Sequence, residues 1–122
     1  MGLDQYAWKV AKENAISDLE IKKDCPVEEI YYWRKVPNLQ GWMENLYREK
    51  GGTKEFNCDV VKLTEEDLDE LENAIKNDAL PDTEGPFFGK HYVEDMDNVV
   101  EFIYKARKVL RNGDCVYYSS WW

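Results

Sequence analysis

The chain has 122 residues and a formal net charge of −9, and apolar residues make up 43% and charged residues 34% of the sequence. This length and balance predict one globular domain over residues 1–122 and exclude a disordered chain. No run of about 18 apolar residues is present, and residues 1–10 lack the pattern of a secretory signal. We therefore expect neither a membrane span nor export.

The cysteines and the single histidine give no sign of a metal centre. Cys25, Cys58 and Cys115 are far apart, odd in number and without a CxxC pair, and with His91 they lack the paired spacing of zinc modules. Free thiols of this kind are typical of a reducing compartment. We expect a cytoplasmic protein that holds no metal and no cofactor.

The first part of the chain begins with a strand pattern. Residues 3–11 alternate, and period two is typical of a strand. One side of this strand would carry Tyr6, Trp8 and Val10. The polar residues 12–25 are ambiguous, and a short helical turn near residues 15–19 is the expectation. Residues 29–35 fit either a strand or the end of a short helix.

Three later segments carry the apolar stripe of an amphipathic helix. They are residues 39–50, 65–77 and 96–111. A polar residue stands before or at the start of each, where its side chain can accept a hydrogen bond from a free backbone N–H. The expected capping residues are Asn38, Thr64, and either Asp95 or Asp97. Basic residues gather in the last turns of the first and third segments, which suits the helix dipole.

A strand and a loop lie between these helices. Residues 55–63 are rich in strand-forming residues. Residues 79–92, ALPDTEGPFFGKHY, contain two prolines, two glycines and two adjacent phenylalanines. Proline fixes φ and glycine allows positive φ, so this pattern predicts a rigid loop that carries aromatic rings to a binding rim or into the core.

The last stretch, residues 114–122, has a strand pattern with aromatic rings on both sides. We expect an interior strand with one face under the helices. A strand of this kind must be covered on both faces, or one face must be a binding surface. Together the segments predict an α+β domain, in which an antiparallel sheet of three or four strands has three helices mainly on one face.

The charge is concentrated in one block. Residues 64–101 contain 13 acidic and two basic residues, a local charge of −11. Such a surface repels nucleic acid and favours a protein partner with a basic surface. The alternative is a solvated helix surface that only keeps the protein soluble. The candidate partner-binding residues are Glu65, Glu66, Asp69 and Glu72.

Polar and aromatic residues from several segments could instead form a pocket for a nucleotide-like molecule, because rings provide stacking surfaces and an arginine fork binds phosphate or carboxylate. The candidate ligand-binding residues are Arg34, Asn38, Trp42, Asn57, Phe87, Phe88, His91, Tyr117, Tyr118, Trp121 and Trp122. Structural roles are the alternative for each of them. Asn38 could cap a helix, Trp42 could lie in the core, and Arg34 could be a buried partner of Asp4.

Catalysis has little support in the sequence. An enzyme needs a nucleophile with a base, paired carboxylates or a metal. His91 is the single histidine and could act as a general base beside the loop. We assign no catalytic residue. A small enzyme that uses His91 is the third and least favoured hypothesis for the function.

Several stretches resemble a family of small proteins found in tailed bacteriophages and bacterial genomes. They are MGLDQY, YYWRK, FNC, LPDTEGPFFG and YYSSWW. The family loop more often reads GFFFG, so Pro86 departs from it and is expected to stiffen the turn. Some members are labelled phosphoglycerate kinase, which is a far larger two-domain enzyme. A chain of this length without a phosphate-cradling glycine-rich loop does not fit that label.

The resemblance implies a phage-type accessory protein in the cytoplasm of a host cell. The leading hypothesis is a non-catalytic protein that binds a host or defence protein through the acidic block, the aromatic loop or both. The alternative hypothesis is a small-ligand binder whose pocket is formed by Arg34, residues 80–91 and the last strand.

Overall fold

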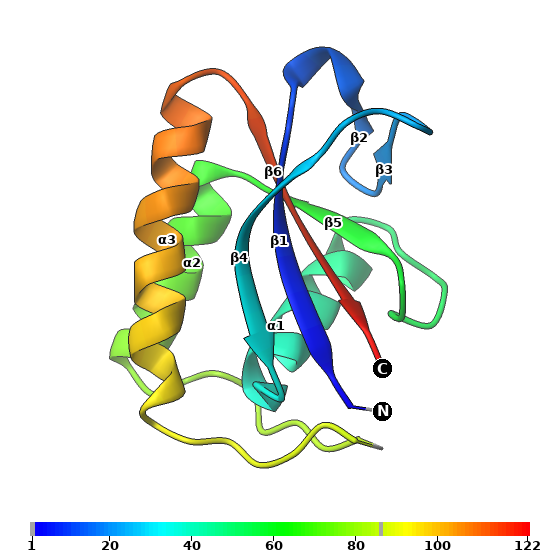
Figure 1. Cartoon of the computed structure of the whole chain (residues 1–122). Coiled ribbons are helices and arrows are strands. Elements are labelled where there is room, and N and C mark those ends of the chain that lie inside the picture. Colours follow the sequence, from blue (N-terminus) through cyan, green and yellow to red (C-terminus); the bar gives the residue numbers. More distant parts are fainter. Residues whose placement is uncertain (1, 86) are drawn as a thin grey trace.

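A four-stranded antiparallel sheet forms the centre of the molecule (Figure 1). We analysed a computed structural model, which describes residues 2–85 and 87–122; the expected stiffening at Pro86 lies outside them. The strand order is β4-β1-β6-β5, and every neighbouring pair is antiparallel. The strands are β1 (Asp4–Val10), β4 (Glu28–Arg34), β5 (Val60–Leu63) and β6 (Cys115–Trp121).

Three helices pack on one face of this sheet. They are α1 (Pro37–Glu49), α2 (Glu65–Lys76) and α3 (Asp95–Arg111). Each contributes to one hydrophobic core with residues from all four strands, among them Ala7, Trp33, Val61 and Tyr118. The predicted α+β fold is confirmed, including the helices mainly on one face.

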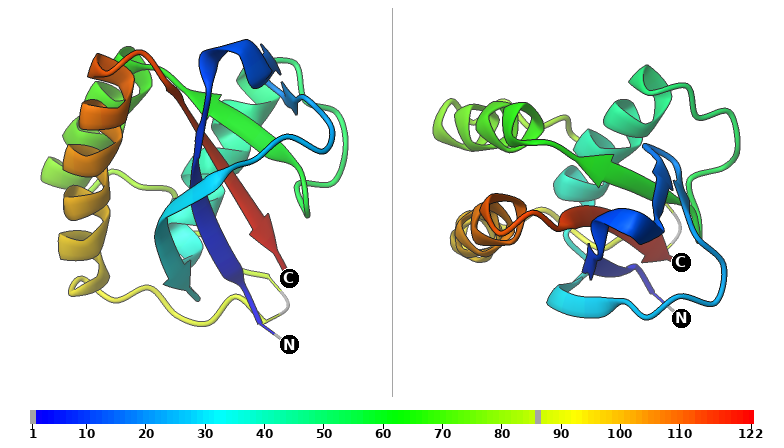
Figure 2. Two further views of the ribbon diagram at one scale, coloured as in Figure 1. Left: turned by 45° about the horizontal axis from the view of Figure 1, so that its top comes forward. Right: turned by 90° about the horizontal axis from the view of Figure 1, so that it is seen from above.

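A small hairpin lies on the opposite face of the sheet from α2 and α3 (Figure 2). It consists of β2 (Ala15–Ser17) and β3 (Glu20–Ile21), preceded by the short 3-10 turn η1 (Lys12–Asn14). The hairpin packs on Val10, Cys115 and Tyr117, and the hydroxyl of Tyr117 donates to the carbonyl of Ser17 at 2.5 Å. The expected helical turn at residues 15–19 is therefore wrong, because contacts with β6 hold this polar segment extended.

The final strand is an interior strand, as its pattern predicts. β6 lies between β1 and β5 and pairs along its whole length with β1. Val116 and Tyr118 point into the core under the helices, whereas Cys115 and Tyr117 lie under the hairpin. Rings on both sides of β6 are therefore covered over most of the strand, with the exception of Trp121.

The predicted helix boundaries agree with the structure to within about two residues, whereas two of the three predicted helix caps do not. Thr64 caps α2 in a capping box with Asp67, as expected. Asn38 does not cap α1, because the helix begins one residue earlier at Pro37, whose missing N–H needs no partner. Neither Asp95 nor Asp97 caps α3, which follows Glu94 without a side-chain cap.

Two strand expectations also change. Residues 28–34 form a strand, which resolves the ambiguity at residues 29–35. The expected strand at 55–63 is correct only for β5, because Cys58 has φ +67° and extended pairing cannot pass through that conformation. The turn before β5 is thereby placed beside the end of β6, where the backbone N–H of Cys58 donates to the carbonyl of Ser120 at 2.7 Å.

The loop at residues 79–92 is fixed to the rest of the fold at several places. The backbone N–H of Thr83 donates to Oδ1 of Asn38 at 3.2 Å. A Cβ built on Gly41 would lie 1.8 Å from Oγ1 of Thr83, so the loop packs directly on the backbone of α1. Further along, the N–H of Leu3 donates to the carbonyl of Phe87 at 3.1 Å. On its way from α2 to α3, the loop thus contacts first α1 and then the start of β1.

Candidate functional site

The hairpin leaves part of the sheet face opposite the helices uncovered. The side chains there come from three adjacent strands and include four aromatic rings. We call this surface the open face and define it by Asp4, Tyr6, Trp8, Glu29, Tyr32, Arg34 and Trp121. Its members share one side because the cross-strand pairs Asp4–Arg34, Asp4–Trp121 and Tyr6–Tyr32 lie in register.

Three rings of the open face are in contact, with Tyr6 stacked on Trp8 and tilted against Tyr32. Tyr6 lies 5.3 Å from Trp8 with an interplanar angle of 19°, and 5.3 Å from Tyr32. The indole N–H of Trp8 donates to Oγ of Ser119 at 2.8 Å. Tyr32 is 45% exposed and Trp121 66% exposed. Exposed groups of aromatic rings are common at binding surfaces, which makes the open face the candidate site.

Two carboxylates border these rings. The hydroxyl of Tyr32 donates to Oδ1 of Asp4 at 2.5 Å, and this hydrogen bond raises the pKa of Tyr32. Partial burial raises the pKa of Tyr6, and the charges of Asp4 and Glu29 raise it further. Asp4 therefore contributes negative charge beside both phenol rings, and the charge of Arg34 opposes its effect on Tyr32.

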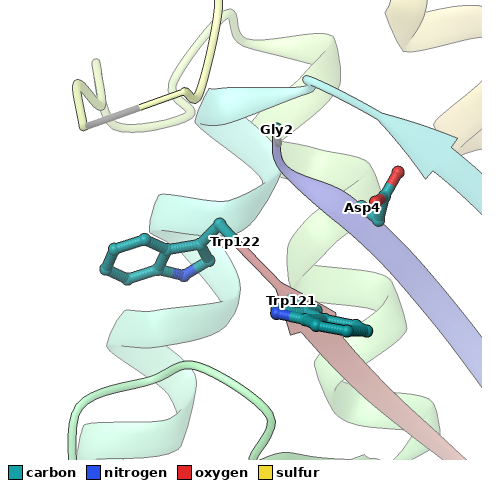
Figure 3. A pocket seen from close by; sticks show the side chains of 4 residues that line it. All are labelled: Gly2, Asp4, Trp121 and Trp122. Atoms are coloured by element: carbon teal, nitrogen blue, oxygen red, sulfur yellow. The ribbon is translucent and has the colours of Figure 1, made fainter.

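A pocket opens where the open face meets the end of β6 (Figure 3). Its lining residues are Gly2, Asp4, Trp121 and Trp122, and its volume is about 330 Å³. Gly2 and Asp4 lie on the same side of the Trp121 indole, whereas Trp122 points away from that ring. The pocket therefore has a flat aromatic wall and a carboxylate within one small space.

Trp122 is held firmly by residues outside the sheet. Its backbone N–H donates to Oδ1 of Asn57 at 3.1 Å, and its carbonyl accepts from Nδ2 of Asn57 at 2.8 Å. The indole N–H donates to the carbonyl of Phe56 at 3.1 Å. Phe88 packs edge-on against the indole with the ring centres 5.1 Å apart. This wall of the pocket is thus fixed by the aromatic loop and by the turn before β5.

Arg34, Asp4 and Trp121 form one row across β4, β1 and β6, and Arg34 lies at the end of this row opposite Trp121. It is the cross-strand neighbour of Asp4 on the side away from Trp121. A Cβ built on Gly2 would lie 2.7 Å from Nη2 of Arg34, so the guanidinium packs against the Gly2 backbone. Arg34 is exposed, and the expectation of a buried arginine is wrong.

The candidate ligand residues fall into two groups in the structure. Those near the pocket are Arg34, Asn57, Phe87, Phe88, Trp121 and Trp122. Phe87 is exposed, whereas Phe88 is buried against Trp122. The others have structural surroundings. Asn38 binds the loop, Trp42 packs against the core, Tyr117 lies under the hairpin, and Tyr118 donates to Gln40 at 2.6 Å.

His91 lies in a different pocket, of about 270 Å³, with Asn38, Thr83 and Lys90 among its lining residues. Its Nδ1 is buried and has no hydrogen-bond partner among residues 2–85 and 87–122. Burial raises the pKa of the nearby Asp95, and the charge of His91 opposes that rise. These contacts describe an imidazole packed at the start of α3, and they leave the catalytic hypothesis for His91 a prediction.

Sequence reasoning did not select five members of the open face, nor Gly2. The alternation of residues 3–11 does group Tyr6 with Trp8, and this signal was available. Asp4, Glu29 and Tyr32 carry no comparable signal, because their meeting depends on which strands pair and in which register.

Two arginines at the end of α3 neutralise part of the charge of the acidic block. The Arg107 guanidinium on α3 contacts Asp69 at 2.7 Å and Glu72 at 3.1 Å, and Nε of Arg111 lies 3.6 Å from Glu65. The hydrogen bond from Arg107 lowers the pKa of Glu72. Three of the four candidate partner-binding acids therefore tie α2 to α3, and Glu66 is exposed on the same helix.

Comparisons with known proteins identify no relative of this chain. No protein-family model, curated protein or solved structure matches it. Within the described residues, none of the helices combines the length and apolar character needed to cross a membrane. The geometry of the site is therefore the basis for a functional assignment.

Proposed function

We propose that the protein is a non-catalytic binding protein that holds another protein against the open face. The observation that carries this proposal is the row of rings formed by the half-buried Trp8 and Tyr6 and the exposed Tyr32, which lies beside the exposed Trp121. Aromatic residues are enriched in protein interfaces, where they supply large contact areas at low entropic cost. Pairing of β1 with both β4 and β6 holds these rings in a fixed arrangement before binding.

The partner should present a basic surface. Asp4 and Glu29 place negative charge beside the rings, and the chain as a whole has a net charge of −9. Such a field speeds the approach of a basic protein. The acidic block contributes through its long-range field, because Asp69 and Glu72 already have an intramolecular partner in Arg107. The resemblance to phage-type proteins makes a host or defence protein in the cytoplasm the expected partner.

A binding experiment with matched variants tests this proposal. The wild-type protein and the double variant Tyr32→Ser/Trp121→Ser are used to capture proteins from a lysate of cells that carry the gene. Tyr104→Ser is the control, because Tyr104 is a 62% exposed ring on α3 outside the open face. We expect a basic protein that the wild type and the control capture and the double variant does not, and whose capture weakens as salt increases.

The captured protein is then purified and its affinity measured by calorimetry. Thermal melting of the three forms shows whether the substitutions change the fold. Equal capture by the wild type and the double variant, with intact folds, would rule out the open face as the binding surface.

A second candidate function is binding of a nucleotide-like small molecule. The pocket beside Trp121 favours it, because an exposed indole can stack on a base while Arg34 binds a phosphate. A thermal-shift screen against nucleotides and cyclic nucleotides tests this function. A stabilising ligand whose effect disappears in Arg34→Ala would support it, and no shift at millimolar concentrations would count against it.

A further inference from the structure

We infer that the pocket lined by Gly2, Asp4, Trp121 and Trp122 receives the side chain of an arginine from the partner protein. This inference rests on the proposed function and specifies the chemistry of one contact within it. Three features of the pocket lead to it: the flat indole, the carboxylate beside it, and the position of Arg34.

The first feature is the exposed indole. Trp121 is 66% exposed, and one ring face is turned toward the side on which Gly2 and Asp4 lie (Figure 3). Gly2 lines the pocket through its backbone, and the guanidinium of Arg34 fills the position that a Cβ of Gly2 would take. Cations are attracted to the face of an aromatic ring, and indole is the strongest of the natural side chains in this respect. A planar guanidinium can also stack on the ring, whereas an ammonium group cannot.

The second feature is the carboxylate of Asp4. Oδ1 of Asp4 accepts a hydrogen bond from Tyr32, which fixes the orientation of the group. A carboxylate has about four lone-pair positions, so this one bond leaves capacity for a donor that enters the pocket. The charge-assisted hydrogen bond from a guanidinium to a carboxylate is among the strongest that side chains form. Stacking and hydrogen bonding together fit arginine.

The third feature is the order of residues across the sheet. Arg34, Asp4 and Trp121 follow one another in a single row over β4, β1 and β6. Asp4 therefore lies between the Arg34 position and the Trp121 side of the pocket. The guanidinium of Arg34 packs on the backbone of Gly2, and the negative charge of Asp4 between it and Trp121 offsets part of its repulsion of an incoming cation.

Short peptides provide a direct test. Acetyl-Gly-Arg-Gly-amide is titrated into the ¹⁵N-labelled protein, and the indole N–H signal of Trp121, assigned from Trp121→Phe, is followed by NMR. The same peptide with lysine in place of arginine tests whether a planar cation is required. The peptide with citrulline, whose side chain has nearly the shape of arginine but no charge, tests whether the charge is required. Guanosine monophosphate tests the nucleotide alternative at the same pocket.

We expect the arginine peptide to shift the Trp121 signal, the lysine peptide to bind several-fold more weakly, and the citrulline peptide to bind about tenfold more weakly or not at all. Asp4→Asn should lower the affinity for the arginine peptide about tenfold, while its amide oxygen can still accept from Tyr32. Glu66→Gln, which removes an exposed acid on α2, is the matched control and should leave the affinity unchanged.

Three results would overturn the inference. They are binding of the citrulline peptide as tight as that of the arginine peptide, equal effects of Asp4→Asn and Glu66→Gln, and a Trp121 shift with guanosine monophosphate but not with the arginine peptide. The capture experiment gives a separate result. If the peptide tests fail but the double variant Tyr32→Ser/Trp121→Ser still does not capture the partner, the open face remains the binding surface and the pocket does not receive an arginine.

Discussion

Asn57 and Trp122, which are 65 residues apart, form a pair of hydrogen bonds with N···O distances of 2.8 and 3.1 Å. The carboxamide of Asn57 acts here as a neighbouring strand would, because its donor and its acceptor satisfy both backbone groups of one residue. The end of β6 is thereby extended beyond the sheet, and one wall of the candidate pocket is positioned by a side chain from a loop.

Replacing Asn57 should release this wall. We expect Asn57→Ala to lower the free energy of unfolding by about 1–2 kcal/mol, because two hydrogen bonds are lost and two backbone groups lose their partners. Hydrogen exchange at the Trp122 amide should become faster. Chemical denaturation and exchange NMR measure the two effects. Asn45→Ala, at an exposed position on α1, is the control, and equal effects of the two variants would contradict the prediction.

Asp67 joins α1 to α2 through a single oxygen. Its Oδ2 accepts from Nζ of Lys50 at 2.6 Å and from the N–H of Thr64 at 2.9 Å. We expect Asp67→Ala to cost about 2–4 kcal/mol of stability, because the capping box is lost and the largely buried Lys50 loses the carboxylate that pairs with its charge and keeps the carbonyl of Lys62. Urea denaturation measures the change. Glu66→Ala, one residue earlier in the same turn, should cost less than about 0.5 kcal/mol.

Acid should weaken the contact between α2 and α3. The pKa of Glu72 is lowered by its hydrogen bond with Arg107, so its contribution is present above the unfolded value of about 4.5 and is lost as the pH falls through the lower folded value. We expect the stability of the wild type to fall below pH 4.5 more steeply than that of Glu72→Gln. Urea midpoints at a series of pH values from neutral to acidic test this, and parallel curves would contradict it.

Alkali should loosen the hairpin on β6. Burial raises the pKa of Tyr117 to about 12, and its hydroxyl donates to the carbonyls of Ser17 and Glu20. A folded pKa above the unfolded value of 10.0 means that the contribution is complete below pH 10 and is lost as the pH rises toward 12. We expect Tyr117→Phe to be about 1 kcal/mol less stable at neutral pH and less sensitive to alkali.

Ultraviolet titration of the phenolate and denaturation at several alkaline pH values measure this effect. Tyr104→Phe, at an exposed position on α3, is the control and should match the wild type throughout. If Tyr117→Phe lost stability above pH 10 as steeply as the wild type, Tyr117 would not be the responsible group.

The sequence by itself determined the helices, the interior strand and the fold class. The stripe of Leu39, Met43 and Leu46, the capping box of Thr64 and the alternation in β6 depend on residues within a few positions of one another, and backbone geometry fixes these periods. Only the tertiary structure decided the site. Asp4 meets Trp121, Arg107 pairs with Asp69 and Glu72 of α2, and the hairpin covers Tyr117, because strand register and helix packing bring together residues far apart in the chain.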